Sequence, residues 1–353
     1  MKIIRTTVTC CTVLFGVGVG TGYSSYAITQ NLYEGKTIDV LIGYSAGGGY
    51  DAYARLVARH MGRHIPGEPA LVPRNMPGGG GRVLAGYLEN VAAQDGTVLA
   101  TADQSLPLQQ ALGDKTITFD TSKFAWIGTP VADNNTTVTW HTTGVKTIED
   151  VKKKQIVMGA TGENTSAQYP RAMNYFVGTK FRVIVGYPGG NDINLAMERG
   201  EVGGRGSNNW PSWKSTRADW LKDEKINLLV QIGLKKDPEL SEVPLLMDLA
   251  TNPEDKAALR LLSAPIAVGR PIFSTPNVPE GRLELLRDAF DATMRDAAFL
   301  EKAKKMNLDI SPSSGADLQN VVDDILATPK PVVRRLSSAI APQEGEVTRP
   351  KSK

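Results

Sequence analysis

The chain has 353 residues, of which 41% are hydrophobic and 22% are charged, and its formal net charge is +3 at pH 7. This composition is typical of an ordinary globular protein that is long enough for two domains. Because basic and acidic residues nearly balance, the sequence argues against a nucleic-acid surface or a polybasic membrane patch, and we expect no nucleic-acid partner.

The first 27 residues have the pattern of a secretory signal peptide. Lys2 and Arg5 precede a stretch without charge, residues 8–22, and small residues follow at Ser25 and Ala27. Glycine and threonine interrupt the stretch, which is shorter than the roughly 20 apolar residues that a membrane span needs. We therefore expect residues 1–27 to be a cleavable signal peptide and the mature protein to be a soluble protein of the periplasm.

Strand-like and helix-like runs alternate from residue 37 onward. The sequence predicts strands at residues 37–44, 70–74 and 97–101. A helix at 52–65 follows the first strand, and a second helix, which turns Leu84 and Leu88 inward, follows the second strand. This βαβαβ order is typical of an open parallel sheet with helices on its faces.

The same alternation restarts in the second half of the chain. Strands are predicted at 156–160, 181–187 and 226–232, the last of these returning toward the first half. The helices of this half are predicted at 167–176, 193–199 and, as one long stretch, 279–306. We therefore predict two α/β lobes with two crossings, near residues 128 and 232.

These crossings define the predicted domains. Lobe I comprises residues 28–128 plus 233–341, lobe II comprises residues 129–232, and residues 342–353 form a flexible tail. Ligands of open α/β sheets bind outside the carboxyl ends of the strands, so the loops of both lobes should face a common ligand cleft.

A glycine-rich turn, Ser45–Asp51, joins the first strand to the first helix. A strand that ends in such a turn before a helix N-terminus offers free backbone N–H groups to an anion. The pattern also satisfies the G-x-G-x-x-A form of a dinucleotide site. Asp51 in the first helical turn, and the absence of an acidic residue after the second strand at Arg74-Asn75, favour a smaller anion. A tight turn without any ligand is the remaining alternative.

A second turn of interest, Thr161–Ser166, ends a strand and opens a helix in lobe II. Its hydroxyl and N–H groups would either cap that helix or close on the other end of the ligand. The glycines of Asn75–Gly81 form a further flexible turn at the edge of the first sheet.

Catalytic and metal-binding patterns are weak. His60 and His64 stand four residues apart, but no glutamate lies between them in the HExxH manner. No G-x-S-x-G motif occurs, and both cysteines, Cys10 and Cys11, lie in the signal peptide. We therefore expect no enzyme activity, no metal and no cofactor. The alternative is an exported α/β enzyme or nucleotide-binding oxidoreductase that uses the Gly47–Gly49 loop.

Several segments together resemble one known family. Tyr44–Asp51, followed by Ala54-Arg55, resembles the F-x-x-G-G-x-x-D…A-R element of the Bug family, the extracytoplasmic solute receptors of tripartite tricarboxylate transporters. The resemblance continues in the family's order over nearly the whole mature chain, through Asn75–Gly81, Asp95–Thr97, Gly186–Gly189, Met197–Val202 and Val278-Pro279.

The resemblance implies a type II periplasmic-binding-protein fold that closes on a small mono-, di- or tricarboxylate and presents it to membrane transporter subunits. We expect the receptor itself to be a monomer. By position, it implies a ligand site at Ser45, Ala46, Gly47, Gly48, Asp51, Thr101, Asp103, Thr161, Gly162, Asn164, Thr165, Ser166 and Tyr187. The sequence departs from the family at Gly203–Ser207. This difference places Arg205 or Ser207 where they would contact a different end of the ligand.

Overall fold

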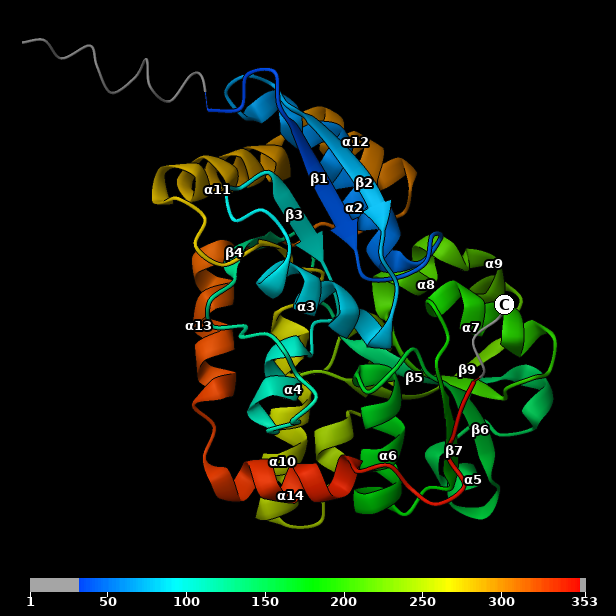
Figure 1. Ribbon diagram of the computed structural model, residues 1–353. Coiled ribbons are helices and arrows are strands. Elements are labelled where there is room, and N and C mark those ends of the chain that lie inside the picture. The colour runs from blue at the N-terminus through cyan, green and yellow to red at the C-terminus, as the bar shows by residue number, and fades with distance from the viewer. Residues whose placement is uncertain (1–31, 350–353) are drawn as a thin grey trace, which may run out of the picture.

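The computed structural model describes residues 32–349 of the chain. Within this range the chain forms two six-stranded sheets, each covered by helices (Figure 1). The two-lobed α/β architecture predicted from the sequence is confirmed. The predicted signal peptide, residues 1–27, lies outside the described residues.

The first sheet takes its strands from two separate parts of the chain, in the order β11-β4-β10-β3-β1-β2. Its strands are β1 (Thr37–Ile42), β2 (Ala70–Asn75), β3 (Val98–Thr101), β4 (Ala125–Thr129), β10 (Ile272–Ser274) and β11 (Ser313–Ser314). β1 is parallel to β2 and β3, as the βαβαβ pattern predicts, whereas β10 runs antiparallel between β3 and β4. The carboxyl ends of β1 and β3 therefore lie side by side.

The second sheet has the order β12-β7-β6-β8-β5-β9. Its strands are β5 (Asn135–Trp140), β6 (Ile156–Gly159), β7 (Phe181–Val185), β8 (Gly204–Asn209), β9 (Ile226–Ile232) and β12 (Val347–Thr348). The strand predicted at 226–232 is present as β9, the last strand of this sheet before the chain crosses back. β9 pairs antiparallel with β5 from Ile226 to Ile232, so this strand stays in the second sheet and the chain leaves only after it.

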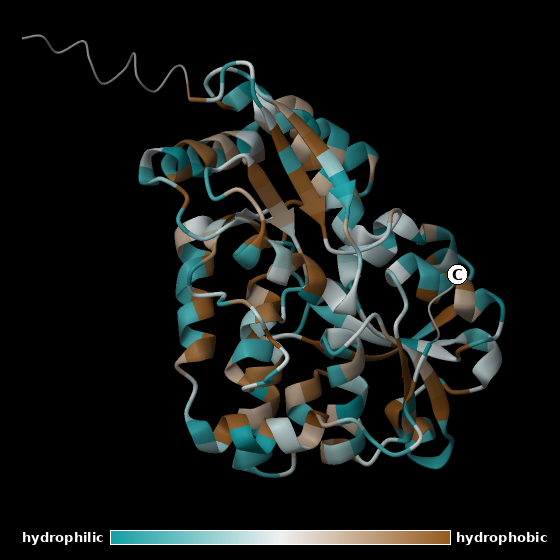
Figure 2. Ribbon diagram, viewed as in Figure 1, coloured by the Kyte–Doolittle hydropathy of each residue, from teal (hydrophilic) through white to brown (hydrophobic). Residues whose placement is uncertain are grey.

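Helices cover both sheets and turn their apolar side chains inward. They are α2 (Gly49–Met61), α3 (Arg82–Asn90), α4 (Leu106–Ala111), α5 (Ile148–Lys153), α6 (Thr165–Val177), α7 (Gly190–Glu198), α8 (Trp210–Thr216), α9 (Ala218–Lys222), α10 (Pro253–Ser263), α11 (Glu280–Arg295), α12 (Ala297–Lys305), α13 (Gly315–Leu326) and α14 (Lys330–Ile340). On α2, the buried face of Tyr53, Leu56, Val57 and Met61 packs against β1 and against α11 and α12. Figure 2 shows hydrophobic residues gathered on the strands and polar ones on the outer helices.

The long helix predicted at 279–306 is two helices, α11 and α12, separated at Asp296. This residue has extended backbone angles, and its carboxylate accepts hydrogen bonds from the backbone N–H groups of Ala298 and Phe299. An aspartate that caps a helix in this way competes with a continuous helix, because its side chain replaces the missing backbone partners.

The chain crosses between the sheets at three places. It leaves the first sheet after Thr129, leaves the second after Ile232, and returns to the second sheet after α14. This last return involves the stretch that the sequence suggested as a flexible tail from residue 342. In the structure, β12 pairs in parallel with β7, Val347 beside Ile184, and extends the second sheet by one strand.

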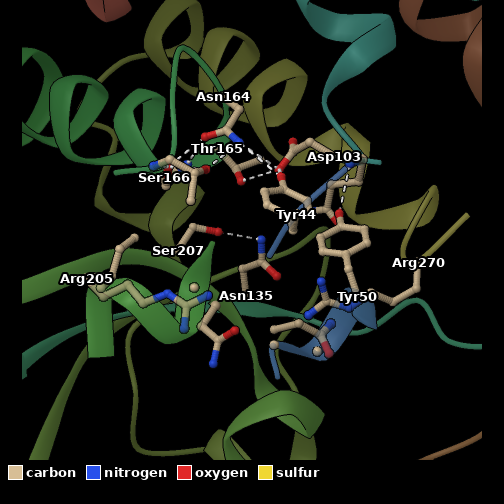
Figure 3. Close-up of a pocket in the computed structure, with 18 residues that line it drawn as sticks. Tyr44, Tyr50, Asp103, Asn135, Asn164, Thr165, Ser166, Arg205, Ser207 and Arg270 are labelled. Carbon is tan, nitrogen blue, oxygen red and sulfur yellow. Dashed lines mark hydrogen bonds between the residues drawn. The ribbon is translucent and has the colours of Figure 1, made fainter. Parts of the chain in front are cut away.

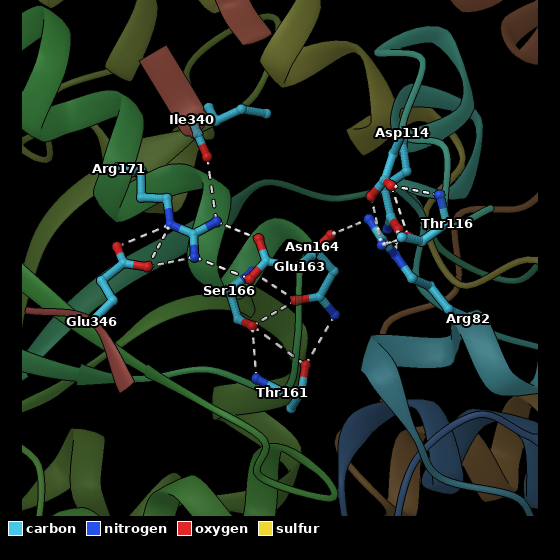
Figure 4. A network of polar contacts seen from close by, with 11 residues as sticks. Arg82, Asp114, Thr116, Thr161, Glu163, Asn164, Ser166, Arg171, Ile340 and Glu346 are labelled. Carbon is cyan, nitrogen blue, oxygen red and sulfur yellow. Dashed lines mark hydrogen bonds and ion pairs between the residues drawn. The ribbon is translucent and has the colours of Figure 1, made fainter. Parts of the chain in front are cut away.

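An ion-pair network holds this C-terminal return in place (Figure 4). Arg171 of α6, whose side chain is 1% exposed, donates from Nε to Glu346 Oε1 at 3.0 Å and pairs through Nη2 with Glu346 Oε2 at 2.5 Å. Its other side pairs with Glu163, and the carbonyl of Glu163 accepts a hydrogen bond from Arg82 Nη2 at 3.3 Å. Because Glu163 belongs to the 161–166 turn, the network connects the C-terminal strand to a predicted ligand loop.

Candidate functional site

A polar pocket lies between the two lobes, where β1 and β3 of the first sheet and β6 and β8 of the second meet (Figure 3). Its cavity has a volume of about 50 Å³. Three helices of at least nine residues begin beside it, since Gly49 opens α2, Thr165 opens α6 and Gly190 opens α7. This is the location that the strand-end rule predicts for a ligand.

The pocket lining contains eight of the residues predicted from the sequence. They are Gly48, Asp103, Thr161, Asn164, Thr165, Ser166, Arg205 and Ser207. The lining also contains ten residues that were not predicted as site residues from the sequence: Tyr44, Gly49, Tyr50, Gln104, Asn135, Gly190, Ile193, Asn208, Asn209 and Arg270. The structure therefore brings together the predicted loops of both lobes.

At one end of the pocket, Asp103 is buried and fully hydrogen-bonded. Its Oδ2 accepts from the Tyr44 hydroxyl at 2.6 Å, from Asn164 Nδ2 at 3.1 Å and from Thr165 Oγ1 at 3.3 Å, and its Oδ1 accepts from the N–H and hydroxyl of Ser105. Burial, together with the Asp103 carboxylate, raises the pKa of Tyr44 well above its ordinary value, so the hydroxyl keeps its proton and donates. Asn164 and Thr165 belong to the second lobe, and these bonds therefore join the lobes.

The turn at 161–166 caps α6, which is one of the two roles considered for it, and it also contacts the other lobe. Asn164 Oδ1 caps α6 by accepting from the N–H of Ser166 at 3.1 Å, and Ser166 Oγ accepts from the N–H of Thr161 at 2.9 Å. The amide group of the same Asn164 faces the other lobe, where it also contacts the Tyr44 hydroxyl at 3.1 Å. The cap fixes the turn, and the fixed turn directs a donor across the cleft.

Asp51 lies outside the pocket lining and braces the glycine turn. Its carboxylate accepts from the N–H of Gly47 at 3.0 Å, from Arg55 Nε at 2.9 Å and from Asn75 Nδ2 at 2.9 Å. Asn75 Nδ2 also donates to the carbonyl of Tyr44 at 2.8 Å. Asp51 thus holds the end of β1, the end of β2 and the start of α2 together.

The other predicted site residues also lie outside the lining: Ser45, Ala46, Gly47, Thr101, Gly162 and Tyr187. Two of them join the lobes at the rim of the pocket. Ser45 donates from its hydroxyl to Asp192 Oδ2 at 2.6 Å and from its N–H to the carbonyl of Pro188 at 3.2 Å. A Cβ atom on Gly162 would lie 2.6 Å from the backbone of Gly79, so the lobes approach there as closely as glycine permits.

At the opposite end of the pocket, two arginines contribute positive charge. Arg205 comes from β8, donates from Nη1 to Asn194 Oδ1 at 3.2 Å and lies over the Trp213 ring. Arg270 precedes β10, donates from Nη2 to Ser212 Oγ at 2.6 Å and lies over the Tyr50 ring at 4.1 Å. Arg270 carried no sequence signal, because it stands far from both predicted loops and outside any recognisable motif.

The described residues hold no group of three or more His, Cys, Asp or Glu side chains arranged for a metal ion. Over residues 32–349, none of the helices combines the length and apolarity that crossing a bilayer would require.

Neither a protein-family model nor a curated protein matches the chain. Similar proteins are found among the solved structures. The periplasmic binding protein BugD superposes with a TM-score of 0.69 at 17% identity, over 86% of this chain and 97% of that one. The chain has the periplasmic-binding-protein fold. This fold also relates it to R. palustris Rpa4515, solved with adipate (TM-score 0.66, 17% identity, 86% and 97% covered). MatC from Rhodopseudomonas palustris, solved with malate, superposes similarly (TM-score 0.66, 16% identity, 86% and 98% covered).

Proposed function

We propose that this protein is a periplasmic solute-binding receptor. It captures a small carboxylate-bearing solute by closure of its two lobes and delivers it to the membrane subunits of a tripartite tricarboxylate-type transporter. The observation that carries the proposal is the position of the pocket: both lobes line it, and Asn164 and Thr165 of one lobe bond to Asp103 of the other across it.

Such a pocket links binding to a change of shape. A solute held between two lobes contacts both only when they are closed, so it shifts the population from open to closed. The hinge would lie in the first two crossings, where Asn134 Nδ2 donates to Gln231 Oε1 and to the carbonyl of Lys235, both at 2.8 Å. Closure then presents a new combined surface that a transporter recognises.

A carboxylate suits the site for two reasons. BugD, Rpa4515 and MatC share the fold, and the structures of the last two contain adipate and malate. In this chain, the N-termini of α2, α6 and α7 at the pocket add a favourable environment for negative charge.

Binding without catalysis fits the lining better than the alternative of an exported enzyme or nucleotide-binding oxidoreductase. The residues that surround the pocket include no histidine and no cysteine, the usual general base and thiol nucleophile. In the glycine turn, the N–H of Gly47 is already bound to Asp51, and that carboxylate would repel a pyrophosphate.

A ligand screen tests the proposal. Purified protein is heated with and without mono-, di- and tricarboxylates, and hits are measured by calorimetry and by small-angle X-ray scattering. We expect at least one carboxylate to raise the melting temperature and to reduce the radius of gyration. If no carboxylate does so, or if a bound acid is chemically converted, the proposed function is wrong.

A further inference from the structure

Arg205 and Arg270 have no acidic partner in the part of the chain that the structure describes. Nε of each guanidinium is buried and without a hydrogen-bond partner, and the groups that the remaining nitrogens contact are a neutral amide and a neutral hydroxyl. Arg270 is 6% exposed and Arg205 is partly buried. A charge removed from water without a counter-charge is costly.

Three carboxylates at or beside the pocket are already engaged elsewhere. Asp103 is bound by five donors at the other end of the pocket, Asp192 accepts the hydroxyl of Ser45, and Asp51 pairs with Arg55. Burial, followed by the charge of the Arg270 guanidinium, lowers the pKa of Arg205 to about 9. Since arginine side chains retain their proton in proteins, this direction reports an uncompensated positive site.

The two guanidiniums come from opposite lobes, and both residues line the cleft. Arg205 stands on β8 of the second sheet, whereas the backbone N–H of Arg270 is bonded to Thr129 Oγ1 at the end of β4 in the first sheet. Figure 3 shows the two side chains extending from opposite sides toward the region below Asn135. A Cβ atom on Gly190 would lie 2.1 Å from Arg205 Nη2, and one on Gly49 would lie 3.0 Å from Arg270 Nη2. Each guanidinium therefore lies against the start of a helix, α7 or α2.

We propose that Arg205 and Arg270 together bind the anionic group of the ligand, and that this ligand is a small acid with one such group. The inference rests on the proposed function and narrows its substrate class. An anion between the guanidiniums replaces repulsion across the cleft with two charge-assisted contacts, one to each lobe. Closure thereby depends on the negative charge of the ligand.

The restriction to one anionic group follows from the remaining lining. The charged residues of the lining are Asp103, Arg205 and Arg270. The lining therefore carries one more positive than negative charge, and a single anionic group balances it. The other buried, unpartnered polar atoms of the lining are neutral: Gln104 Nε2, Asn208 Nδ2 and Asn209 Oδ1. They suit a hydroxyl or carbonyl group rather than a second carboxylate. The cavity has a volume of about 50 Å³, and this small volume matches a short acid.

Calorimetry with charge-matched probes tests the inference. Acetate, glycolate, lactate and pyruvate carry one carboxylate, succinate and malate carry two, and lactamide is the neutral isostere of lactate. We expect a monocarboxylate to bind at least about tenfold more tightly than succinate and malate, and lactamide to show no binding. Arg205→Gln and Arg270→Gln should each weaken the monocarboxylate by about 10- to 100-fold, because each removes a charge-assisted contact.

Controls separate a binding role from a structural one. Arg199→Gln removes an exposed arginine of the same lobe as Arg205, and Arg74→Gln removes one from the first lobe, and both should leave affinity unchanged. If dicarboxylates bind more tightly than monocarboxylates, or if Arg205→Gln and Arg270→Gln retain the acid-over-amide preference, the inference is overturned while the proposed function stands. If the wild type binds none of these acids, the inference is overturned, and the proposed function is overturned as well only when the wider carboxylate screen is also negative.

Discussion

The contact between Glu346 and Arg171 provides the sharpest test of the structure outside the pocket. The Arg171 side chain is 1% exposed and that of Glu346 is 9% exposed, so Glu346→Gln leaves a buried guanidinium with half of its counter-charge. Removal of one partner from a buried ion pair costs about 3–5 kcal/mol. Glu163, which is 38% exposed, remains as the other partner, and we therefore expect a loss of about 2–3 kcal/mol.

Thermal unfolding followed by circular dichroism measures this loss. At about 2–4 °C per kcal/mol, the range for domains of roughly 150–250 residues, the melting temperature should fall by at most about 4–12 °C. Glu344→Gln is the matched control, because Glu344 is exposed in the same C-terminal stretch, and it should change the free energy of unfolding by less than about 0.5 kcal/mol. A Glu346→Gln variant as stable as the Glu344→Gln variant would refute the conclusion that the C-terminal return is an integral part of the fold.

Three further predictions concern the cleft. Gly80→Ala should weaken ligand binding by at least about tenfold in calorimetry, because its Cβ atom would lie 2.4 Å from Asn164 Nδ2 of the other lobe. Gly79→Ala is the control, since its backbone is equally strained but its Cβ atom has more space, and it should bind the ligand better than Gly80→Ala. Equal affinities of the two variants would show that the lobes do not meet at Gly80. Asp51→Ala should lower stability by about 1–2 kcal/mol in urea unfolding, because the Gly47 N–H and Asn75 amide lose their acceptor, and an unchanged midpoint would contradict its bracing role. Asn164→Asp places a carboxylate against Asp103, so the radius of gyration with ligand should stay near the open value at neutral pH, and normal closure would disprove the contact.

The sequence predicted the parts of the fold that local patterns specify. The alternation of apolar runs around Gly47–Gly49 was enough to place β1, α2 and the turn between them, and the cap at Asn164 follows from the residue type at the end of a strand. The break at Asp296 was missed because the apolar spacing on either side is compatible with one helix.

The residues that the sequence did not predict depend on contacts between distant segments. Arg270 reaches the pocket only because β10 is inserted between β3 and β4, a pairing that no local pattern encodes. Asp51 was read as a ligand group, but its position in the structure depends on Asn75, a residue from the end of the next strand. Strand composition does not specify which sheet receives β12 either.

The position of β12 also affects the order in which the molecule assembles. Its partner β7 is synthesised long before residues 347–348, and until they arrive β7 is an edge strand with unpaired backbone groups. Open strand edges of this kind promote pairing between chains. The second lobe therefore completes its sheet last, when Glu346 reaches Arg171. A chain that ended before Glu346 would be expected to aggregate before it loses its binding site.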